Sequence, residues 1–535
     1  MFIRALLVAI IATISTGWIN HIIAWPAIYP VFSGFLVGLA MGEPTVGMIA
    51  GATINLAYLG WITAGGSMPG NLSVAGVFGT ALTILSGADP KLAVSFAIPL
   101  SLIGILMWNL QMTINVFWVH KADAYAEEGN TKGVQLMTYL FPQLTVFLIN
   151  GVPAFLLVYF GGDFFMNLIS NLPESFINAL EVVGGLMPAL GIGMLLKFIG
   201  KKKLIPFFFI GFFISSYLGL NLMAIAILGA AIAAYSYMSS VKKESLFDDE
   251  GDESEEKSEH DTGSGKKLRK KDLVLHWFLG LSQECAYNYE RLQATGTCAA
   301  IIPIIKRLYN TKEDISAALK RYLVFFNTEP CFVGPIIPGI CASMEEQRAN
   351  GIDITDESVI SLRTGLMGPL AGVGDTLSQG ILYPTVAALA CSMAIEGNAL
   401  GPVLFFAVFS GLMVLLGYNM YMLGYTKGKE SIIKLLQSNM LEQVTDAFSI
   451  LGLMVIGAMG AERVLVNIPI SFTVGQTTVI IQEVIDSLIP NLVPLLIILI
   501  IWNLVKKNKS ITYIMLGLMA VGIIATYLGI FGLAV

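Results

Sequence analysis

Apolar runs long enough to cross a lipid bilayer recur from one end of this 535-residue chain to the other. A helix needs roughly 20 mostly apolar residues to span the hydrocarbon core, and it satisfies its own backbone hydrogen bonds, as lipid requires. Only 13% of the residues are charged. We therefore predict an all-α polytopic membrane protein. The expected spans are Ala5–Thr16 with its flanks, Leu92–Val119, Leu136–Phe160, Phe207–Met238, Val386–Ser392 with its flanks, Val403–Leu423, Leu492–Leu504 and Ile511–Val535.

One polar segment, residues 241–272, divides the apolar sequence into two halves of similar length. Apart from Phe247 it has scarcely any apolar side chains, so it buries too little surface to offset the entropy lost on ordering. We predict a disordered linker between two subunit-like domains, residues 1–240 and 273–535. The second domain is expected to have an amphipathic N-terminal part, 273–360, and a membrane part, 361–535.

Clusters of lysine and arginine indicate which loops face the cytoplasm. They occur at Lys201–Lys203, at Lys266–Lys271 and near Lys506. We expect these loops and the linker to be cytoplasmic, and one further pass from Ile511 then leaves the C-terminus outside. Arg4 precedes an apolar run that has no small-residue cleavage site, which favours a first membrane helix over a cleaved signal peptide.

Glycine is unusually dense between Gly34 and Gly87. Such density permits close helix packing, but Gly42-Glu43-Pro44 and residues 65–71 should also break helices. Broken helices are tolerated at membrane depth only inside protein or along a wet cavity, which is how transporters form substrate sites. The pattern favours broken or re-entrant helices around a cavity. Ordinary surface loops between helices are the alternative.

The second half opens with a different pattern. Between Leu273 and Ile360, charged residues alternate with apolar ones at helical spacing, which predicts amphipathic helices lying against the membrane or the first half. Glu345–Gly351 predicts a charged helix end followed by a turn, and membrane helices resume near Leu362.

The sequence also argues against some chemistries. It has no Gly-rich loop ending in Lys-Ser/Thr, which disfavours ATP-driven transport. The cysteines have no metal-ligand spacing, so we expect reduced or buried thiols and no metal. They are Cys285, Cys298, Cys331, Cys341 and Cys391.

Specific motifs then identify a family. In the second half they are Tyr287–Arg291 (YNYER), Phe325–Pro330 (FFNTEP), Glu345–Gly351 (EEQRANG) and Leu362–Thr385. From about Lys267 to the C-terminus the chain closely resembles subunit IID of the mannose-family phosphotransferase system (PTS) sugar permeases. The first half is similar to the partner subunit IIC. Its matching stretches are Gly51–Leu56 (GATINL), Leu59–Trp61 (LGW) and Leu204–Phe209 (LIPFFF).

The resemblance implies a IIC–IID fusion in the bacterial cell membrane, with its two halves related by inverted topology, assembled as a homotrimer. Such a permease binds an external sugar and moves it inward, coupled to phosphorylation by a separate IIB protein that IIA charges. It implies no cofactor, no nucleic acid and no phosphorylated residue in this chain, so whether the chain itself counts as an enzyme stays open. None of the four histidines has a phosphate-binding context. They are His21, His120, His260 and His276.

This sequence departs from the family pattern at three positions. Family members usually carry glutamate where this chain has Asn55 and aspartate where it has Asn71, and their IID motif has glutamine where this chain has Glu329. Two carboxylates are absent from one half and one is gained in the other. The departures suggest a rewired polar site and leave the identity of the sugar open.

Candidate sugar ligands in the first half flank its second glycine break. Sugars are recognised by hydrogen bonds from carboxylates and amides to their hydroxyls and by an aromatic face. We expect Asn55, Trp61 and Asn71 to face the sugar. Alternatively, the two amides satisfy backbone groups freed at the break, and Trp61 sits in the interfacial aromatic belt.

In the YNYER motif, Asn288 and Glu290 are two residues apart and would point in different directions on a helix. Both are candidate ligands, and we favour Glu290 because ionisable groups at membrane depth are expensive and usually functional. The alternative for Glu290 is an ion pair with Arg291 or Arg321.

Two further candidates follow along the chain. Asn327 and Glu329 form a plausible polar cluster beside Pro330, which biases the preceding residue away from helix, and a helix-start cap is the alternative role for Glu329. Asp375 follows a glycine turn where a helix would begin, and N-capping is its alternative role.

Two other classes of function stay open. An ion-coupled secondary transporter would use Glu290, Glu329 or Asp375 to bind a proton or sodium ion. A non-transporting membrane receptor would use the same surface to dock a partner. The basic clusters at Lys201–Lys203 and Lys266–Lys271 either steer IIB or only mark topology.

Overall fold

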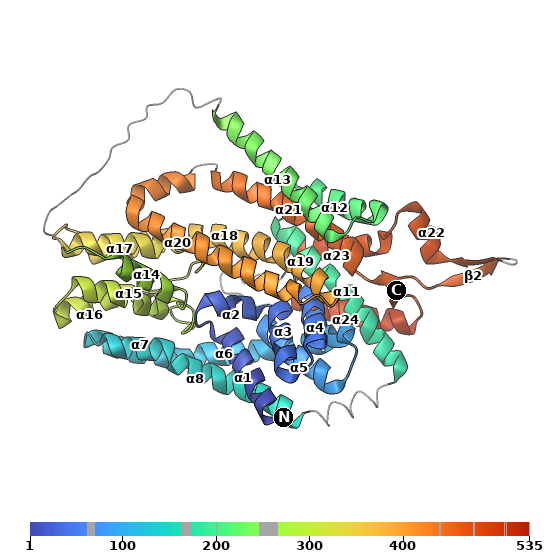
Figure 1. Cartoon of the computed structure of the whole chain (residues 1–535), viewed down its shortest axis with the longest axis horizontal. Helices are drawn as coiled ribbons and strands as arrows, with labels where there is room; N and C mark the ends of the chain where they lie inside the picture. Colours follow the sequence, from blue (N-terminus) through green and yellow to red (C-terminus); the bar gives the residue numbers. More distant parts are fainter. Residues whose placement is uncertain are drawn as a thin grey trace.

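The computed structural model describes residues 1–60, 70–161, 173–199, 201–245, 266–437, 440–474, 477–507, 509 and 511–533. These residues form an elongated stack of helices whose long axis runs roughly along the longest helices (Figure 1). Candidate ligand Trp61 and residues 246–265 of the expected linker lie outside the described residues.

The first half is built from helices. They are α1 (Phe2–Gly17), α2 (His21–Ile28), α3 (Pro30–Met41), α4 (Pro44–Ala57), α5 (Leu72–Ser86), α6 (Ala93–Glu127), α7 (Thr131–Tyr139), α8 (Phe141–Val146), the π turn η3 (Phe147–Gly151), α9 (Val152–Phe160), α11 (Glu174–Ile199), α12 (Ile205–Leu218) and α13 (Leu222–Ser245).

The second half is also mainly helical. Its helices are α14 (Lys270–Gly280), α15 (Ala294–Leu308), α16 (Lys312–Tyr322), α17 (Ile336–Ala349), α18 (Asp356–Asp375), the π turn η4 (Thr376–Leu382), α19 (Tyr383–Ile395), α20 (Leu400–Gln437), α21 (Met440–Arg463), α22 (Ile481–Leu488), α23 (Leu492–Lys506) and α24 (Ile511–Tyr527). Its short strands are β1 (Val466–Asn467), β2 (Ser471–Val474), β3 (Thr477–Ile480) and β4 (Gly532–Leu533).

The prediction of a polytopic helical membrane protein is confirmed. Within the described residues, six helices are long and apolar enough to cross a membrane, or up to eight if each of two bent helix pairs is one span. The unbroken candidates are Pro90–Glu127, Thr131–Phe160, Asn178–Lys197, Leu222–Ser239, Asp356–Ile395 and Leu400–Lys427. The sequence did not predict the strands, which pair β1 with β4 and β2 with β3 in antiparallel fashion.

Helix breaks occur where the backbone leaves the right-handed region. The α1–α2 pair bends by 103°, and Trp18 and Asn20 at this elbow have φ values of 50° and 51°. The predicted break at Gly42 is confirmed: Gly42 has φ 84° and Pro44 opens α4 at a position that needs no backbone N–H. Most of the second predicted break lies outside the described residues, and α5 begins just after Asn71.

The predicted glycine turn before Asp375 is wrong. The chain stays helical from Asp356 to Ile395, passing through the π turn η4. A glycine destabilises a helix by only about 1 kcal/mol, so the surrounding packing decides whether the helix continues through it. Here Gly374 lies against Glu329, where an added Cβ would be 2.4 Å from the Glu329 Cβ. The glycine permits this close approach without ending the helix.

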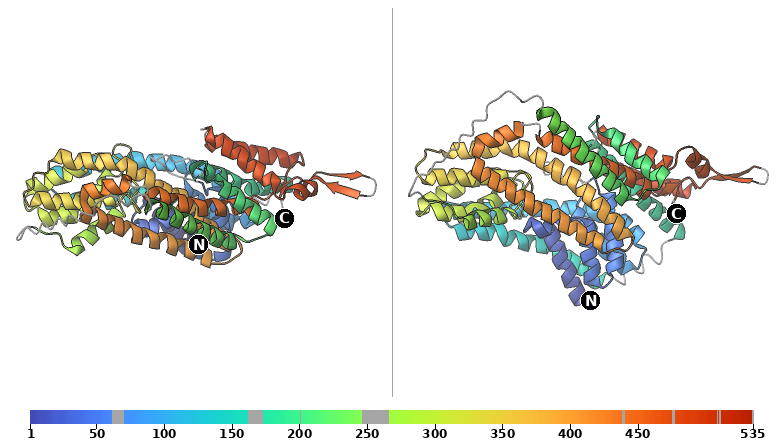
Figure 2. Two further views of the ribbon diagram at one scale, coloured as in Figure 1. Left: turned by 90° about the horizontal axis from the view of Figure 1, so that it is seen from above. Right: turned by 45° about the horizontal axis from the view of Figure 1, so that its top comes forward.

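The two halves are interleaved. In both views of Figure 2 the helices α14–α17 gather at one end of the molecule beside α6 and α7, and α16 packs on α6 and α15 on α7. Of the helices in the stretch predicted to be amphipathic, α15 and α16 therefore lie against the first half. Elsewhere α4 packs on α19, and α12 and α13 pack on α21. Helix α13 runs on to Ser245 and α14 starts at Lys270, so both ends of the expected linker are helical.

Candidate functional site

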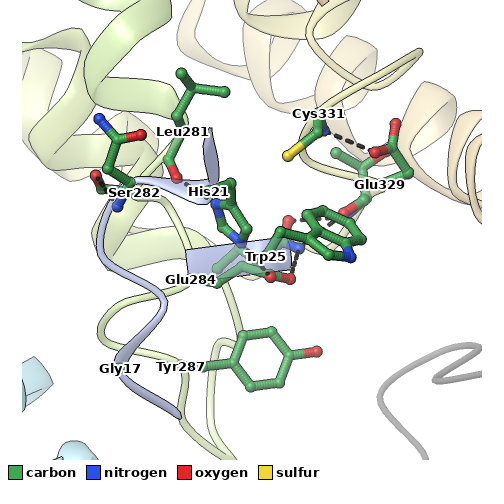
Figure 3. Close-up of polar contacts among 12 residues, drawn as sticks. Gly17, His21, Trp25, Leu281, Ser282, Glu284, Tyr287, Glu329 and Cys331 are labelled. Atoms are coloured by element: carbon green, nitrogen blue, oxygen red, sulfur yellow. Dashed lines mark hydrogen bonds and ion pairs between the residues drawn. The ribbon is translucent and has the colours of Figure 1, made fainter. Parts of the chain in front are cut away.

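A histidine from the first half is clasped by the second half. His21 begins α2 with its side chain buried, and its Nε2 lies 2.9 Å from Glu284 Oε2 while its Nδ1 contacts the Leu281 carbonyl oxygen (Figure 3). Both partners are hydrogen-bond acceptors, so the ring can serve as a donor to the second half. The Asn20 N–H also donates to Ser282 Oγ at 3.0 Å. The α1–α2 elbow is thereby fixed to the loop that follows α14.

Gln293 connects Glu284 to a further segment of the second half. The Gln293 Nε2 donates to Glu284 Oε1 at 2.8 Å and to the Thr328 carbonyl oxygen at 2.7 Å. The Thr328 N–H donates back to Gln293 Oε1 at 2.9 Å. A continuous chain of hydrogen bonds thus links His21 to the segment that holds Glu329.

Glu329 is buried, and its carboxylate accepts only backbone N–H groups among the described residues. The donors are the N–H groups of Cys331 (2.7 Å), Phe332 (2.8 and 3.0 Å), Val333 (2.8 Å) and Gly334 (3.3 Å). They belong to the turns that lead into α17, where free N–H groups and the helix dipole favour an anion. The carboxylate thus holds the turns that precede α17, whereas the helix itself has Pro335 as N-cap and no side-chain cap, so the helix-start cap given above as the alternative role is not what Glu329 provides.

Asp375 lies beside Glu329, one residue after Gly374. The charges of Glu329 and Glu284 act on its half-buried carboxylate, which accepts a hydrogen bond from Gln379 Nε2 at 3.1 Å. N-capping is wrong for Asp375 because the helix is continuous there. Glu284, Glu329 and Asp375 therefore gather near one histidine, His21, at the seam between the halves.

Asn55 reaches the same helix from the first half. It is buried on α4, its Oδ1 accepts from the Val31 N–H at 3.3 Å, and its Nδ2 donates to the Tyr383 hydroxyl at 3.1 Å. Tyr383 stacks on Tyr29 with ring centroids 3.8 Å apart, and the Tyr29 hydroxyl accepts from Trp25 Nε1. The Asn55 side chain thus holds Tyr383, which lies about two helical turns after Asp375 on the same continuous helix.

Asn71 serves as a helix cap. Its Oδ1 accepts from the Val74 N–H at 3.1 Å and its Nδ2 donates to the Gly104 carbonyl oxygen at 3.0 Å. Both ends of the amide are bonded to backbone, which is the alternative role given for it above.

The remaining candidates lie along the α6 side of the seam. The Asn288 amide organises its own loop by accepting from the N–H groups of Glu290 and Arg291. The Glu290 side chain is 40% exposed and pairs with His120 at 3.1 Å, whereas Arg291 pairs with Asp123. The Asn327 Oδ1 accepts from the Tyr287 hydroxyl at 3.0 Å.

The sequence analysis missed His21, Glu284 and Gln293. Only His21 offered a usable signal, because it is an ionisable residue between Asn20 and Ile22 in an otherwise apolar stretch, and such residues are usually functional in membranes. The sequence around Glu284 and Gln293 does not show that the fold brings them to His21.

Comparison with known families assigns each half separately. Residues 2–235 match the family model of the PTS system sorbose-specific IIC component. Residues 267–531 match the model of the PTS system mannose/fructose/sorbose family IID component.

Known relatives agree with this division. The sorbose-specific EIID component of Klebsiella pneumoniae is 40% identical over 272 residues, covering 49% of this chain and 98% of the relative. The mannose-specific EIID component of Escherichia coli K12 is 38% identical over 279 residues, covering 51% of this chain and 98% of the relative. The N-acetylgalactosamine permease IIC component 1 of the same strain is 30% identical over 218 residues, covering 40% of this chain and 80% of the relative.

Proposed function

The chain belongs to the mannose/sorbose family of PTS permeases, with a IIC component followed by a IID component, and we propose that it binds an external sugar and moves it inward while IIB phosphorylates it. The trapped product would be a charged sugar phosphate. Since IIB carries the phosphate, this chain would supply the binding site and the route across the membrane.

The observation that carries this proposal is the acidic cluster at the seam. Glu284, Glu329 and Asp375 come from three separate segments of the second half, and His21 of the first half pairs with one of them. Carboxylates accept hydrogen bonds from adjacent sugar hydroxyls, and ionisable groups are retained inside membrane proteins mainly for function.

Asp375 is the best candidate for the principal sugar ligand. Hydrogen bonds already occupy the Glu329 carboxylate fully, and both oxygens of Glu284 have partners. The Asp375 carboxylate is half-buried and immediately precedes the π turn η4. Such turns occur often at functional sites because they alter the regular hydrogen-bond ladder. In this assignment Asn55 and Glu329 position the walls of the site, Asn327 and Asn288 shape its α6 side, and Asn71 supports α5.

Topology and assembly follow from the same proposal. The basic loops and residues 241–272 would face the cytoplasm, where IIB docks, and the C-terminus would lie outside. The linker would keep domains 1–240 and 273–535 at high effective concentration and at one-to-one stoichiometry. Three such chains would form the homotrimer.

Reconstituted vesicles test the proposal. Sugar uptake should require IIB, IIA and the upstream phosphate donors, and Asp375→Asn should reduce it at least tenfold because a carboxylate acceptor is lost. Glu357→Gln, an exposed acid on α18, is the matched control and should transport normally. Uptake driven by a proton or sodium gradient without any phosphotransfer protein would instead support an ion-coupled transporter.

A further inference from the structure

Three aromatic rings meet at the seam beside the acidic cluster. Trp18 comes from the α1–α2 elbow, Trp108 from α6 and Tyr287 from the second half. The ring centroids lie 4.7 Å apart for Trp18 and Trp108, 5.8 Å for Trp18 and Tyr287, and 6.0 Å for Trp108 and Tyr287. Figure 3 shows Tyr287 next to Glu284.

One face of α6 adds amide groups to these rings. Trp108, Gln111 and Asn115 are spaced i, i+3 and i+7, which places them on one side of the helix. Trp108 contacts the Tyr287 ring, and Asn115 Nδ2 donates to the Tyr287 carbonyl oxygen at 2.9 Å. Gln111 lies between them along the helix and so faces the same seam.

The acceptor oxygens of these amides are not used. Gln111 is 3% exposed and Asn115 is fully buried, yet Gln111 Oε1 and Asn115 Oδ1 have no hydrogen-bond partner within the described part of the chain. An unpaired buried polar atom is costly, so a seam that gathers two of them calls for an explanation.

Backbone strain surrounds the same cluster. Trp18 has φ 50° and Leu292 has φ 51°, and both pack against the cluster of Trp108, Met112 and Tyr287. Positive φ is uncommon in residues other than glycine and is strained for large side chains. Strain of this kind accumulates at ligand clamps and switch regions.

We propose that Trp18, Trp108, Gln111, Asn115 and Tyr287 form a second sugar-binding subsite on the transport route. Its chemistry suits the neutral part of a monosaccharide, because aromatic rings cover C–H faces and amide oxygens accept hydroxyl hydrogens. In this structure the rings pack on one another, so the subsite is closed, and a sugar enters when they separate. The inference rests on the proposed function and adds a transit step to it.

The course of α6 gives this subsite a direction. Beyond Asn115 the helix reaches an open cavity of about 630 Å³, which the Asp123–Arg291 ion pair helps to line. Its lining residues are Asp123, Glu127, Arg291, Lys320, Leu323, Val324 and Phe325. The subsite therefore lies between the acidic cluster and a cavity at the end of the seam that the basic residues assign to the cytoplasm.

Replacing Gln111 separates a functional role from a packing defect. Gln111→Leu removes the unpaired amide, so the melting temperature of the purified chain should rise or stay unchanged. IIB-dependent uptake should nevertheless fall about fivefold in maximal rate, with the KM for sugar within twofold of wild type. Asn150→Leu is the control, since it removes another buried amide with an unpaired oxygen, on η3, and should transport normally.

Normal uptake by Gln111→Leu would overturn the proposal and identify Gln111 as a packing defect. Should that variant fold poorly, Gln111→Met and tryptophan fluorescence decide the question: saturating sugar should change the emission of the wild-type chain, and Trp108→Phe should abolish most of that change. An unchanged response in Trp108→Phe would also overturn it. If the wild-type chain itself shows no IIB-dependent uptake, the proposed function fails first.

Discussion

Two buried charge clusters in the second half have opposite character. In the cluster between α16 and α17, Arg321 Nε lies 2.9 Å from Glu345 Oε1, and both side chains are at most 2% exposed. At the seam, Glu284, Glu329 and Asp375 lie close together, and of the three only Glu284 pairs with His21 among the described residues. Matched charges in the first cluster hold helices together, whereas the excess of carboxylates in the second is costly and points to a ligand or a proton.

Titration behaviour fits the structural role of the first cluster. Burial by itself would lower the pKa of Arg321, but Glu345 and the other groups around the guanidinium, Asp356 among them, together outweigh burial and raise the pKa, so the guanidinium stays charged. Burial, together with Glu345, raises the pKa of Tyr309, whose hydroxyl therefore stays protonated and donates to Glu345 at 2.7 Å. Tyr322 donates to the same carboxylate at 2.9 Å.

Glu345→Gln should have the largest effect on stability. It removes the buried partner of Arg321 and leaves the guanidinium paired only with the partly exposed Asp356, and breaking a buried ion pair costs about 3–5 kcal/mol. The free energy of unfolding in detergent measures the loss. Glu357→Gln, an exposed acid nearby, should change stability by no more than about 0.5 kcal/mol. Equal stability of both variants would remove the contrast between the clusters.

His21→Gln and Glu284→Gln should each lower stability by less than Glu345→Gln does, and the effect of either substitution should depend on whether the other is present. Each substitution should lower stability by about 1–3 kcal/mol, because a charged hydrogen bond is lost while Gln293 still holds residue 284. A double-mutant cycle of unfolding free energies should show coupling of about 0.5–3 kcal/mol. Strict additivity would mean that the seam contact contributes nothing.

Asn71→Ala should cost about 1 kcal/mol, the usual loss for an N-cap, and should leave the KM for sugar unchanged. Thermal unfolding and uptake kinetics together test this. Asn130→Ala removes the N-cap of α7 and is the matched control. A large rise in KM for Asn71→Ala alone would return Asn71 to the sugar site.

Replacing residues 246–265 by an unrelated flexible sequence of similar length should have the smallest effect, less than twofold on uptake. Both charge clusters are formed by residues outside this segment. Lost transport with intact folding would show that the segment regulates or docks a partner.

Much of the fold could be predicted because it depends on local sequence. Most of the apolar spans and the break at Gly42 follow from residue type alone, although the span Asn178–Lys197 was not among those expected. The prediction failed before Asp375, where Gly374 serves a close contact with Glu329 and not a turn. Glycine permits both, and only the neighbouring segment distinguishes them.

The candidate site shows the same division. Glu329 and Asp375 do lie together, but the reason is the packing of the segment that holds Glu329 against Gly374 of α18, which spacing cannot show. Asn71 and Asn288 are polar residues of the expected type, yet each bonds to nearby backbone. An amide satisfies backbone groups as readily as sugar hydroxyls, so its sequence position does not reveal its role.

By itself the sequence determined that the protein lies in a membrane, that it is helical, that it divides into two halves, and to which family each half belongs. Those properties depend on the hydrophobicity of runs and on short motifs. The tertiary structure alone decided which polar groups share a low-dielectric space. His21 and Glu284 are 263 positions apart and meet at 2.9 Å. Contacts at that separation are set by the packing of whole helices, because no local interaction specifies them.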